Sequence, residues 1–356
     1  MKKGSDNEYL KKVLMIGPDI CGFGGMEEVA RIYRDEIFQP TSLTYICTNS
    51  RFGTSKGLFR WLHTLFALPF QRKKKEILHI HITTGKSFYR KLTIAVWGRV
   101  LGYTVLLQWH GGRARSFFDK GINRTFLKFL GKIISSFIVL TQSWKEYFKN
   151  YLPEAKITVI PNPVRTFEKE PVTIPHKITF LFLGNIDSRK GIFDLISALN
   201  NVKSHPNLFQ LIICGKGEDS ALNHVINRSG LNEIVDFRGW VGDSEKNEVF
   251  KRAHVVVLPS YAEALPMCLL EGMAHRKALI GTDVGGIPEI IENLGNGILI
   301  EKGNITELTE ALLFYLDSPD KVKEHGEKSF DLCKKYMPAA VKTELVDLYK
   351  ALLQKQ

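Results

Sequence analysis

The sequence lacks three patterns that would each have indicated a particular class of protein. Its five cysteines are scattered without a CxxC pair, which argues against a disulfide framework or a zinc site and fits a reducing compartment. It has no run of 18 apolar residues and no long apolar stretch near its N-terminus, so we expect neither a membrane span nor a secretory signal. It also has no D-x-D triplet, a carboxylate pair that can hold Mn²⁺ or Mg²⁺ against a diphosphate.

Acidic residues are scarce in the first half of the chain. Residues 1–163 hold 26 Lys and Arg against 11 Asp and Glu, whereas residues 164–356 hold 23 against 26. A basic first half favours an anionic partner, and nucleic acid and anionic lipid are the candidates. We disfavour nucleic acid because the aromatic residues are not arranged as stacking platforms beside basic strands.

Short β-branched apolar runs alternate with helical patterns along the whole chain, which predicts an α/β fold with parallel sheets. At residues 161–164 the sequence PNPV breaks this alternation, and a polar stretch with Pro171 and Pro175 follows before the alternation restarts. We therefore predict two α/β domains in series, with the cleft between them as the default ligand site. The expected strands are residues 11–17, 42–48, 76–82, 104–110, 137–140 and 157–160 in the first domain, and 177–184, 209–215, 235–239, 254–259, 278–282 and 297–300 in the second. The expected helices between them are residues 26–38, 86–101, 120–133 and 142–150 in the first domain, and about 190–201, 218–229, 244–252, 266–276, 286–292 and 304–317 in the second.

Two glutamates in the segment 260–291 are the strongest candidates for a ligand site. Glu263 follows the expected strand 254–259, and Pro266 is expected to open a helix that contains Glu271. Open α/β sheets bind ligands at the carboxyl ends of their strands. A carboxylate in an apolar helix needs strong donors, and sugar or ribose hydroxyls could supply them. On spacing alone, an equally good interpretation is that Glu263 is a surface residue, Glu271 is an ordinary helix residue and neither binds a ligand.

A second candidate is FLGNIDSRKG at residues 182–191. Here a strand ends in Gly184, and Arg189 and Lys190 stand just before an expected helix, where two cations form a suitable anion site. The alternative is a solvated basic turn.

A glycine-rich loop follows the first expected strand. Gly22, Gly24 and Gly25 let the backbone approach a ligand before an expected helix. The loop fails the dinucleotide fingerprint, because Glu27 occupies the last glycine position, and no acidic residue closes the next strand. This disfavours a nicotinamide-dependent dehydrogenase.

Three histidines lie in or after expected strands of the first half. His110 ends the strand 104–110 and is followed by two glycines, so it is either a site residue or a buried capping residue. His79 and His81 alternate with apolar residues and have no third ligand nearby, so we interpret them as structural rather than as a metal pair.

The pattern S-x-x-E-x-x-P-x-x-x-x-E, followed by GTDVGGIPE, resembles the donor-site signature of retaining glycosyltransferases of family 4, the glycosyl transferases group 1. The organisation of nearly the whole chain is similar to that family, in particular to members of the bacterial surface-polysaccharide type. The resemblance implies the GT-B fold, in which two Rossmann-like domains face each other across a cleft and the last helix crosses back to the first domain. The implied domains are 1–163 with the helix 338–356, which binds the acceptor, and 164–337, which binds the nucleotide-sugar.

The resemblance also implies roles for the candidate residues. Glu263 would contact the transferred sugar, Glu271 the ribose hydroxyls, and His110 would lie near the sugar. Arg189 and Lys190 would clamp the donor diphosphate. Further donor-binding positions carried over by motif are Gly24, Gly25, Gly184, Gly215, Lys216, Trp240, Val241, Ala264, Leu265 and Pro266.

The function that follows is transfer of a sugar, with retention, from a nucleotide-sugar to a saccharide or polyprenyl-diphosphate-linked acceptor in polysaccharide or glycolipid biosynthesis. UDP is expected from family frequency, and no cofactor or metal is expected. Aromatic and basic residues in the segment 56–75, with a cationic stripe, favour a cytoplasmic location on the anionic inner face of the membrane. A packed core helix with solvated lysines is the alternative there, and a sugar-nucleotide epimerase is the rival enzyme. The stripe consists of Lys120, Arg124, Lys128 and Lys132.

Overall fold

The structure is a computed structural model that describes residues 3–22, 24–38, 43–48, 54–72, 74–119, 121–167, 177–203 and 207–354. The chain divides into two compact units, one of Met1–Val164 with Tyr336–Gln356 and one of Arg165–Lys335. The polar stretch with Pro171 and Pro175, Lys120 of the cationic stripe, and residues 355–356 of the last expected helix lie outside the described residues.

Unit 1 contains a six-stranded parallel sheet with the strand order β2-β1-β3-β4-β5-β6. The order reverses between β1 and β3, which are neighbours in the sheet and continue to opposite sides of it. Strands β3 and β4 are buried along their full length, because helices cover both faces of the sheet. The strands are β1 (Val13–Gly17), β2 (Thr44–Cys47), β3 (Ile77–Ile82), β4 (Thr104–Trp109), β5 (Ser136–Val139) and β6 (Ile157–Val159).

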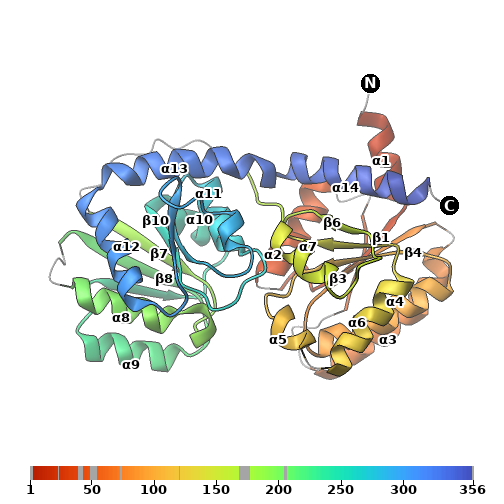
Figure 1. Ribbon diagram of the computed structural model, residues 1–356, viewed down its shortest axis with the longest axis horizontal. Coiled ribbons are helices and arrows are strands. Elements are labelled where there is room, and N and C mark those ends of the chain that lie inside the picture. Colours follow the sequence, from red (N-terminus) through yellow and green to blue (C-terminus); the bar gives the residue numbers. More distant parts are fainter. Residues whose placement is uncertain are drawn as a thin grey trace. The chain divides into compact units, whose positions relative to one another are not determined.

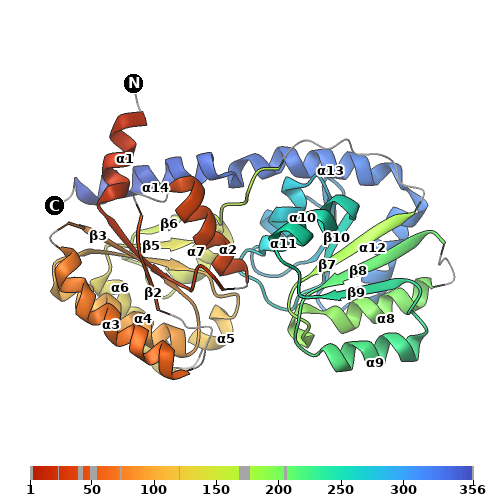
Figure 2. The same cartoon turned by 180° about the vertical axis from the view of Figure 1, so that it is seen from behind.

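The helices of unit 1 form two layers. Helices α3, α4 and α6 lie side by side on one face of the sheet, with α4 in contact with both others (Figure 1). Helix α14 returns from the end of the chain to pack on α1 and on the π-helix Tyr33–Ile37, as the view from behind also shows (Figure 2). The helices are α1 (Lys3–Lys11), α2 (Gly25–Ile32), α3 (Thr54–Arg72), α4 (Lys86–Val100), α5 (Ala114–Phe118), α6 (Gly121–Ile133), α7 (Gln142–Lys149) and α14 (Pro338–Leu353).

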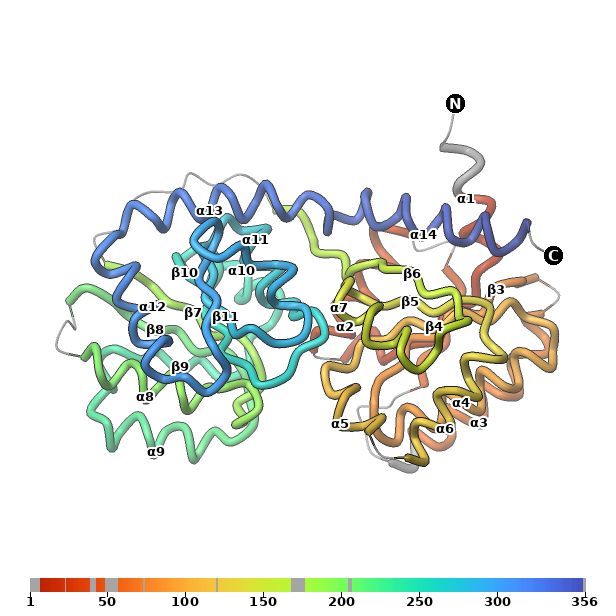
Figure 3. The backbone as a smooth tube through the Cα atoms, in the orientation of Figure 1, coloured from red at the N-terminus to blue at the C-terminus, as the bar shows by residue number. Residues whose placement is uncertain are grey.

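Unit 2 repeats the architecture with the strand order β12-β11-β10-β7-β8-β9, so its order reverses between β7 and β10. The tube drawing traces this chain path from green to blue (Figure 3). The strands are β7 (Ile178–Leu183), β8 (Phe209–Cys214), β9 (Val235–Gly239), β10 (Val255–Leu258), β11 (Ala278–Thr282) and β12 (Gly297–Ile300). The helices are α8 (Ile192–Val202), α9 (Asp219–Ser229), α10 (Asp243–Arg252), α11 (Met267–Ala274), α12 (Ile305–Asp317) and α13 (Asp320–Cys333), with 3-10 turns at Ser188–Lys190, Ile287–Glu289 and Lys334–Tyr336.

The predicted α/β class with two parallel sheets is confirmed, and each expected strand is present within one or two residues of its expected bounds. The expected helix at 286–292 is wrong, because only the 3-10 turn Ile287–Glu289 forms there. Pro288 lies within that turn and Leu294 adopts a positive φ of 58°, so the backbone leaves the helical path almost at once. Pro266 precedes α11 rather than opening it, since its ψ of 123° is extended and the helix begins at Met267.

Candidate active site

Two loops meet where the strand order of unit 2 reverses. One follows β7 and the other follows β10, and these two strands are hydrogen-bonded neighbours. In open α/β sheets such a reversal leaves a crevice at the carboxyl ends of the strands, which is where ligands bind. The predicted residues Arg189 and Lys190 lie on the first loop and Glu263 on the second.

The loop after β7 is held in a fixed shape by Asp187. One carboxylate oxygen of Asp187 accepts from the Lys190 backbone N–H at 3.0 Å, and the other accepts from the Arg189 guanidinium at 3.2 Å. Gly191 follows with a φ of 71°, and a Cβ there would lie 1.9 Å from the Pro259 carbonyl oxygen. Only glycine permits this approach, so the two loops pack backbone to backbone.

The loop after β10 presents Glu263, which is 8% exposed. Its Oε1 accepts hydrogen bonds from the Lys190 ammonium and, at 2.9 Å, from the Ser260 hydroxyl. Gly285 supports the loop from behind, because a Cβ there would lie 1.8 Å from the Glu263 carbonyl oxygen. The structure thus brings Lys190 and Glu263, which are 73 residues apart in sequence, into direct contact.

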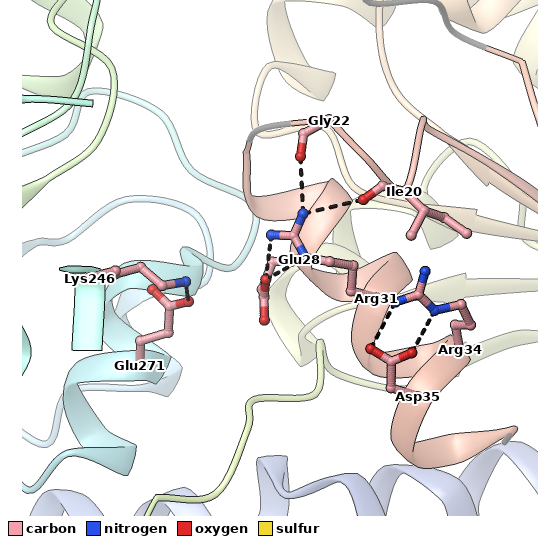
Figure 4. Close-up of polar contacts among 8 residues, drawn as sticks. All are labelled: Ile20, Gly22, Glu28, Arg31, Arg34, Asp35, Lys246 and Glu271. Atoms are coloured by element: carbon pink, nitrogen blue, oxygen red, sulfur yellow. Dashed lines mark hydrogen bonds and ion pairs between the residues drawn. The ribbon is translucent and has the colours of Figure 1, made fainter. Parts of the chain in front are cut away.

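Glu271 lies more than one turn into α11 and is 5% exposed. Its carboxylate accepts from the ammonium of Lys246 on α10 at 2.6 Å, the pair drawn at the left of Figure 4. A buried carboxylate without such a partner would be costly, and Lys246 compensates it inside an apolar helix.

The carboxyl ends of β7, β8 and β9 are joined through glycines. The Gly184 N–H donates to the Cys214 carbonyl at 3.0 Å, and the Gly215 N–H donates to the Gly239 carbonyl at 2.7 Å. A Cβ on Gly215 would lie 1.7 Å from the Gly184 carbonyl oxygen, so this edge tolerates no side chain. Lys216 is exposed just beyond it.

The turn after β9 carries the two predicted base-contact residues. Trp240 is 45% exposed, so it is not part of the core, whereas Val241 is buried. A half-exposed indole at a strand end can stack on a planar ligand.

In unit 1 the glycine loop is fixed by Arg31 of α2. Its guanidinium donates to the carbonyls of Ile20 at 3.3 Å and Gly22 at 3.0 Å, and it pairs with Glu28 at 2.6 Å (Figure 4). Gly24 caps α2 with a φ of 143°, and Gly25 is its first residue. Arg31 thus holds the backbone of the loop in one conformation at the N-terminus of α2, where the predicted residues Gly24 and Gly25 lie.

His110 is nine-tenths buried and belongs to a histidine stack in unit 1. Its Nε2 is 2.8 Å from Nδ1 of His81, whose ring stacks on that of His79. His79 in turn bonds to Tyr349 of α14 at 2.7 Å and to Gln108 at 3.0 Å. Burial lowers the pKa of His110 to about 3, so its ring is neutral near neutral pH. His79 and His81 are core residues, as expected.

The residues that sequence reasoning missed are the partners of the glutamates. Ser260 was visible in the S-x-x-E spacing, but nothing indicated that its hydroxyl would reach Glu263. Lys246 gave no signal, because it lies in a charged helix 25 residues before Glu271.

With this geometry in place, the sequence can be compared with known families. Residues 164–331 match the family described as Glycosyl transferases group 1. The matched range covers nearly all of unit 2, so we refer to it below as the group 1 domain. The site residues on α11 and on the loops after β7 and β10 all lie inside the matched range.

A relative of known name is the alpha-D-kanosaminyltransferase of Streptomyces kanamyceticus, 28% identical over 48% of this chain and 45% of that protein. The chain spans about half the length of the curated relatives that it matches. Among solved structures, sucrose-phosphate synthase from Thermosynechococcus elongatus superposes with a TM-score of 0.78 at 17% identity, over 97% of this chain and 99% of that one. HepE from Anabaena, solved in complex with UDP, gives 0.72 at 16% identity over 96% and 100%. These structures establish the GT-B fold for the group 1 domain and the unit that precedes it.

Proposed function

We propose that the protein is a retaining glycosyltransferase that takes a sugar from a UDP-sugar. The observation that carries the proposal is the contact between Lys190 and buried Glu263 at the strand reversal of the group 1 domain. The match of residues 164–331 to the family and the UDP bound by a protein of the same fold support it.

Each site residue of unit 2 has its own role in binding the donor or in stabilising the leaving group. Arg189 and Lys190 offset the charge that develops on the departing diphosphate when the anomeric C–O bond breaks. Glu263, oriented by Ser260, accepts from the hydroxyls of the transferred sugar, and Glu271 accepts from those of the ribose. The backbone beside Ala264 and Leu265 and the turn at Trp240 and Val241 complete the donor contacts.

Two cations on a fixed loop can neutralise a diphosphate without a divalent ion. We therefore expect transfer to persist in EDTA. Loss of transfer in EDTA with recovery in Mn²⁺ would contradict a metal-independent reaction.

The direct test is donor turnover with the full chain and a panel of UDP-sugars, offered lipid-linked saccharides as acceptors. Glu263→Ala should remove most turnover while the thermal unfolding midpoint changes little. Glu310→Ala, an exposed glutamate of α12 in the same unit, is the matched control and should retain activity. Glu263→Ala with wild-type turnover would remove Glu263 from the site, and inversion at the anomeric carbon by NMR would contradict retention.

The acceptor side of the proposal comes from the outer face of unit 1. Helix α3 exposes a row of large apolar side chains at helical spacing, and its neighbours α4 and α6 expose others. Large exposed apolar surfaces on one side of a protein mark an interaction site. This outer face consists of Phe59 (71% exposed), Leu62 (41%), Phe66 (75%) and Phe70 (78%) on α3, Tyr89 (40%) and Trp97 (37%) on α4, and Ile122 (61%) and Phe129 (45%) on α6.

None of the three helices that carry the outer face contains an acidic residue, and Lys128 and Lys132 of the predicted stripe are exposed on α6. No helix among the described residues meets the length and apolarity needed to span a bilayer. We infer that the outer face lies on an anionic membrane, with a polyprenyl-diphosphate-linked saccharide as acceptor.

Liposome flotation tests the membrane part. Phe66→Ser with Phe70→Ser should release the protein from anionic vesicles, because the two most exposed aromatic side chains of the outer face are lost. The matched control is Leu208→Ser, an exposed apolar residue of unit 2. Equal flotation of the double variant, or no dependence on anionic lipid at low salt, would contradict membrane attachment.

A further inference from the structure

Helix α4 carries a buried lysine that the proposed reaction does not use. Lys91 is only 2% exposed, yet no hydrogen bond or ion pair joins it to any residue that the structure describes. Burying an ammonium group is unfavourable unless an anion or several acceptors compensate it. Such a group therefore calls for a partner that the folded chain does not supply.

The position of Lys91 is informative. It lies in the second turn of α4, which follows β3, and β3 flanks the strand reversal of unit 1. Side chains of a helix lean toward its N-terminus, so Lys91 is directed toward the carboxyl ends of the strands. Its ammonium acts electrostatically on Cys47 at the end of β2, His81 at the end of β3 and His110 after β4.

The start of α4 is also open. Gly85 is its N-cap residue, with a φ of 72°, and has no side chain that could accept from the first turn. A Cβ placed on Gly85 would have nothing within 4 Å, so there is room above this helix end. A helix N-terminus without a side-chain cap favours an anion, and Lys91 adds a cation from the same helix.

Among the described residues, Arg90 and Cys47 act electrostatically on Lys91, and neither is an anion. His81 and His110 are held neutral by burial, which lowers the pKa of both, and the Cys47 thiol has a raised pKa and is also neutral. Burial lowers the pKa of Lys91 itself to about 7, as expected for a buried amine without an anion.

The geometry points to an anion site at the strand reversal of unit 1, in which Lys91 and the start of α4 bind a phosphate group of the acceptor. This inference rests on the proposed function, because it assigns the phosphate to the acceptor. The chemical class is a diphosphate group, which a prenyl diphosphate and free pyrophosphate share. Helix α4 carries Tyr89 and Trp97 of the outer face as well, so one helix would contact both the lipid surface and the phosphate.

The test is calorimetric titration of the full chain, with its donor site saturated by UDP, using pyrophosphate and farnesyl diphosphate as separate probes. Both should bind the wild type, and Lys91→Met should weaken them ~10- to 100-fold, the effect of one charge-assisted hydrogen bond. Arg99→Met, at the other end of α4, is the matched control and should bind like the wild type. Binding of farnesyl diphosphate alone would assign the site to a lipid-linked phosphate.

A stability measurement separates this role from a structural one. Replacing a buried unpaired ammonium by an apolar side chain of similar volume should keep or raise the unfolding midpoint. Lys91→Met that binds both probes like the wild type would overturn the anion site. A large drop in the unfolding midpoint of Lys91→Met would also overturn it, because the fold itself would then compensate the ammonium group. If UDP fails to bind, the donor assignment fails separately, and the titrations are then run without UDP on the Lys190→Met variant.

Discussion

The two units share one architecture but treat buried charge in opposite ways. Each has a six-stranded parallel sheet with one reversal of strand order, and candidate residues follow the strands beside that reversal. In unit 2 the buried carboxylates of Glu263 and Glu271 each have a lysine partner. In unit 1 the buried Lys91 has no partner among the described residues, and the nearby histidines are neutral.

The difference shows what each unit requires from a ligand. A carboxylate already paired with a cation can remain buried and charged, ready to accept from hydroxyls. An unpaired ammonium instead gains most from an anion. Under the proposed function, unit 2 recognises sugar and ribose hydroxyls beside a diphosphate, and unit 1 recognises a phosphate.

The largest effect on turnover is expected from removing the lysine that pairs with Glu263 in unit 2. Lys190→Met should lower kcat ~10²–10³-fold, because one preorganised cation no longer offsets the leaving diphosphate. Steady-state kinetics with a UDP-sugar measures this, and Lys302→Met, exposed in the same unit, is the control. A kcat equal to that of the wild type would show that the Lys190–Glu263 contact serves the fold alone.

A smaller effect is expected from the second pair. Lys246→Met should raise the KM for the donor ~10-fold with little change in kcat, because Glu271 loses the partner that orients it toward the ribose. Glu248→Gln on the same helix is the control. A fall in kcat with unchanged KM would place Lys246 in the chemical step instead.

The histidines of unit 1 predict a pH dependence of stability. Burial lowers the pKa of His79 to about 3, so only the unfolded chain binds a proton there between its ordinary pKa of about 6.5 and 3. The contribution of neutral His79 to the free energy of unfolding is complete above pH ~6.5 and is lost as the pH falls toward 3. Urea unfolding measures the free energy of unfolding at pH ~7.5 and ~5.5. Its decrease between these two pH values should be about 1 kcal/mol smaller in His79→Gln than in the wild type. An identical loss in both proteins would contradict a neutral buried His79.

The smallest effect concerns the half-exposed indole of unit 2. Trp240→Ala should weaken UDP binding only a few-fold, since stacking contributes ~0.5–1.5 kcal/mol, and should leave the unfolding midpoint unchanged. Thermal shift with and without UDP measures both. If Trp240→Ala is destabilised but binds UDP normally, the role of Trp240 is packing rather than UDP binding.

The sequence was most informative where a function depends on local spacing. Strands were predictable because buried parallel strands are continuous apolar runs, and Glu263 and Glu271 were predictable because both lie in one short motif. The partners were not predictable, because Lys246 and Ser260 act through contacts that only the fold creates. Lys91 was missed for the same reason: in α4 it reads as one more solvated lysine, and only packing shows that it is buried.

The helix predicted at residues 286–292 does not form, for a local reason. Its apolar pattern suits a helix, but Pro288 and the positive φ of Leu294 limit it to a single 3-10 turn. Backbone conformation overrides hydrophobic pattern in so short a segment.

The central claim is that the donor binds at the strand reversal of unit 2, and hydrogen–deuterium exchange of the full chain tests it most directly. Saturating UDP should slow exchange in peptides covering 184–191 and 260–272, where Arg189, Lys190, Glu263 and Glu271 lie, more than in peptides covering 219–229 of α9. UDP, GDP, ADP and TDP are compared, so the nucleotide is identified in the same experiment. If no nucleotide protects these two segments, or if protection falls only elsewhere in the chain, the account is contradicted.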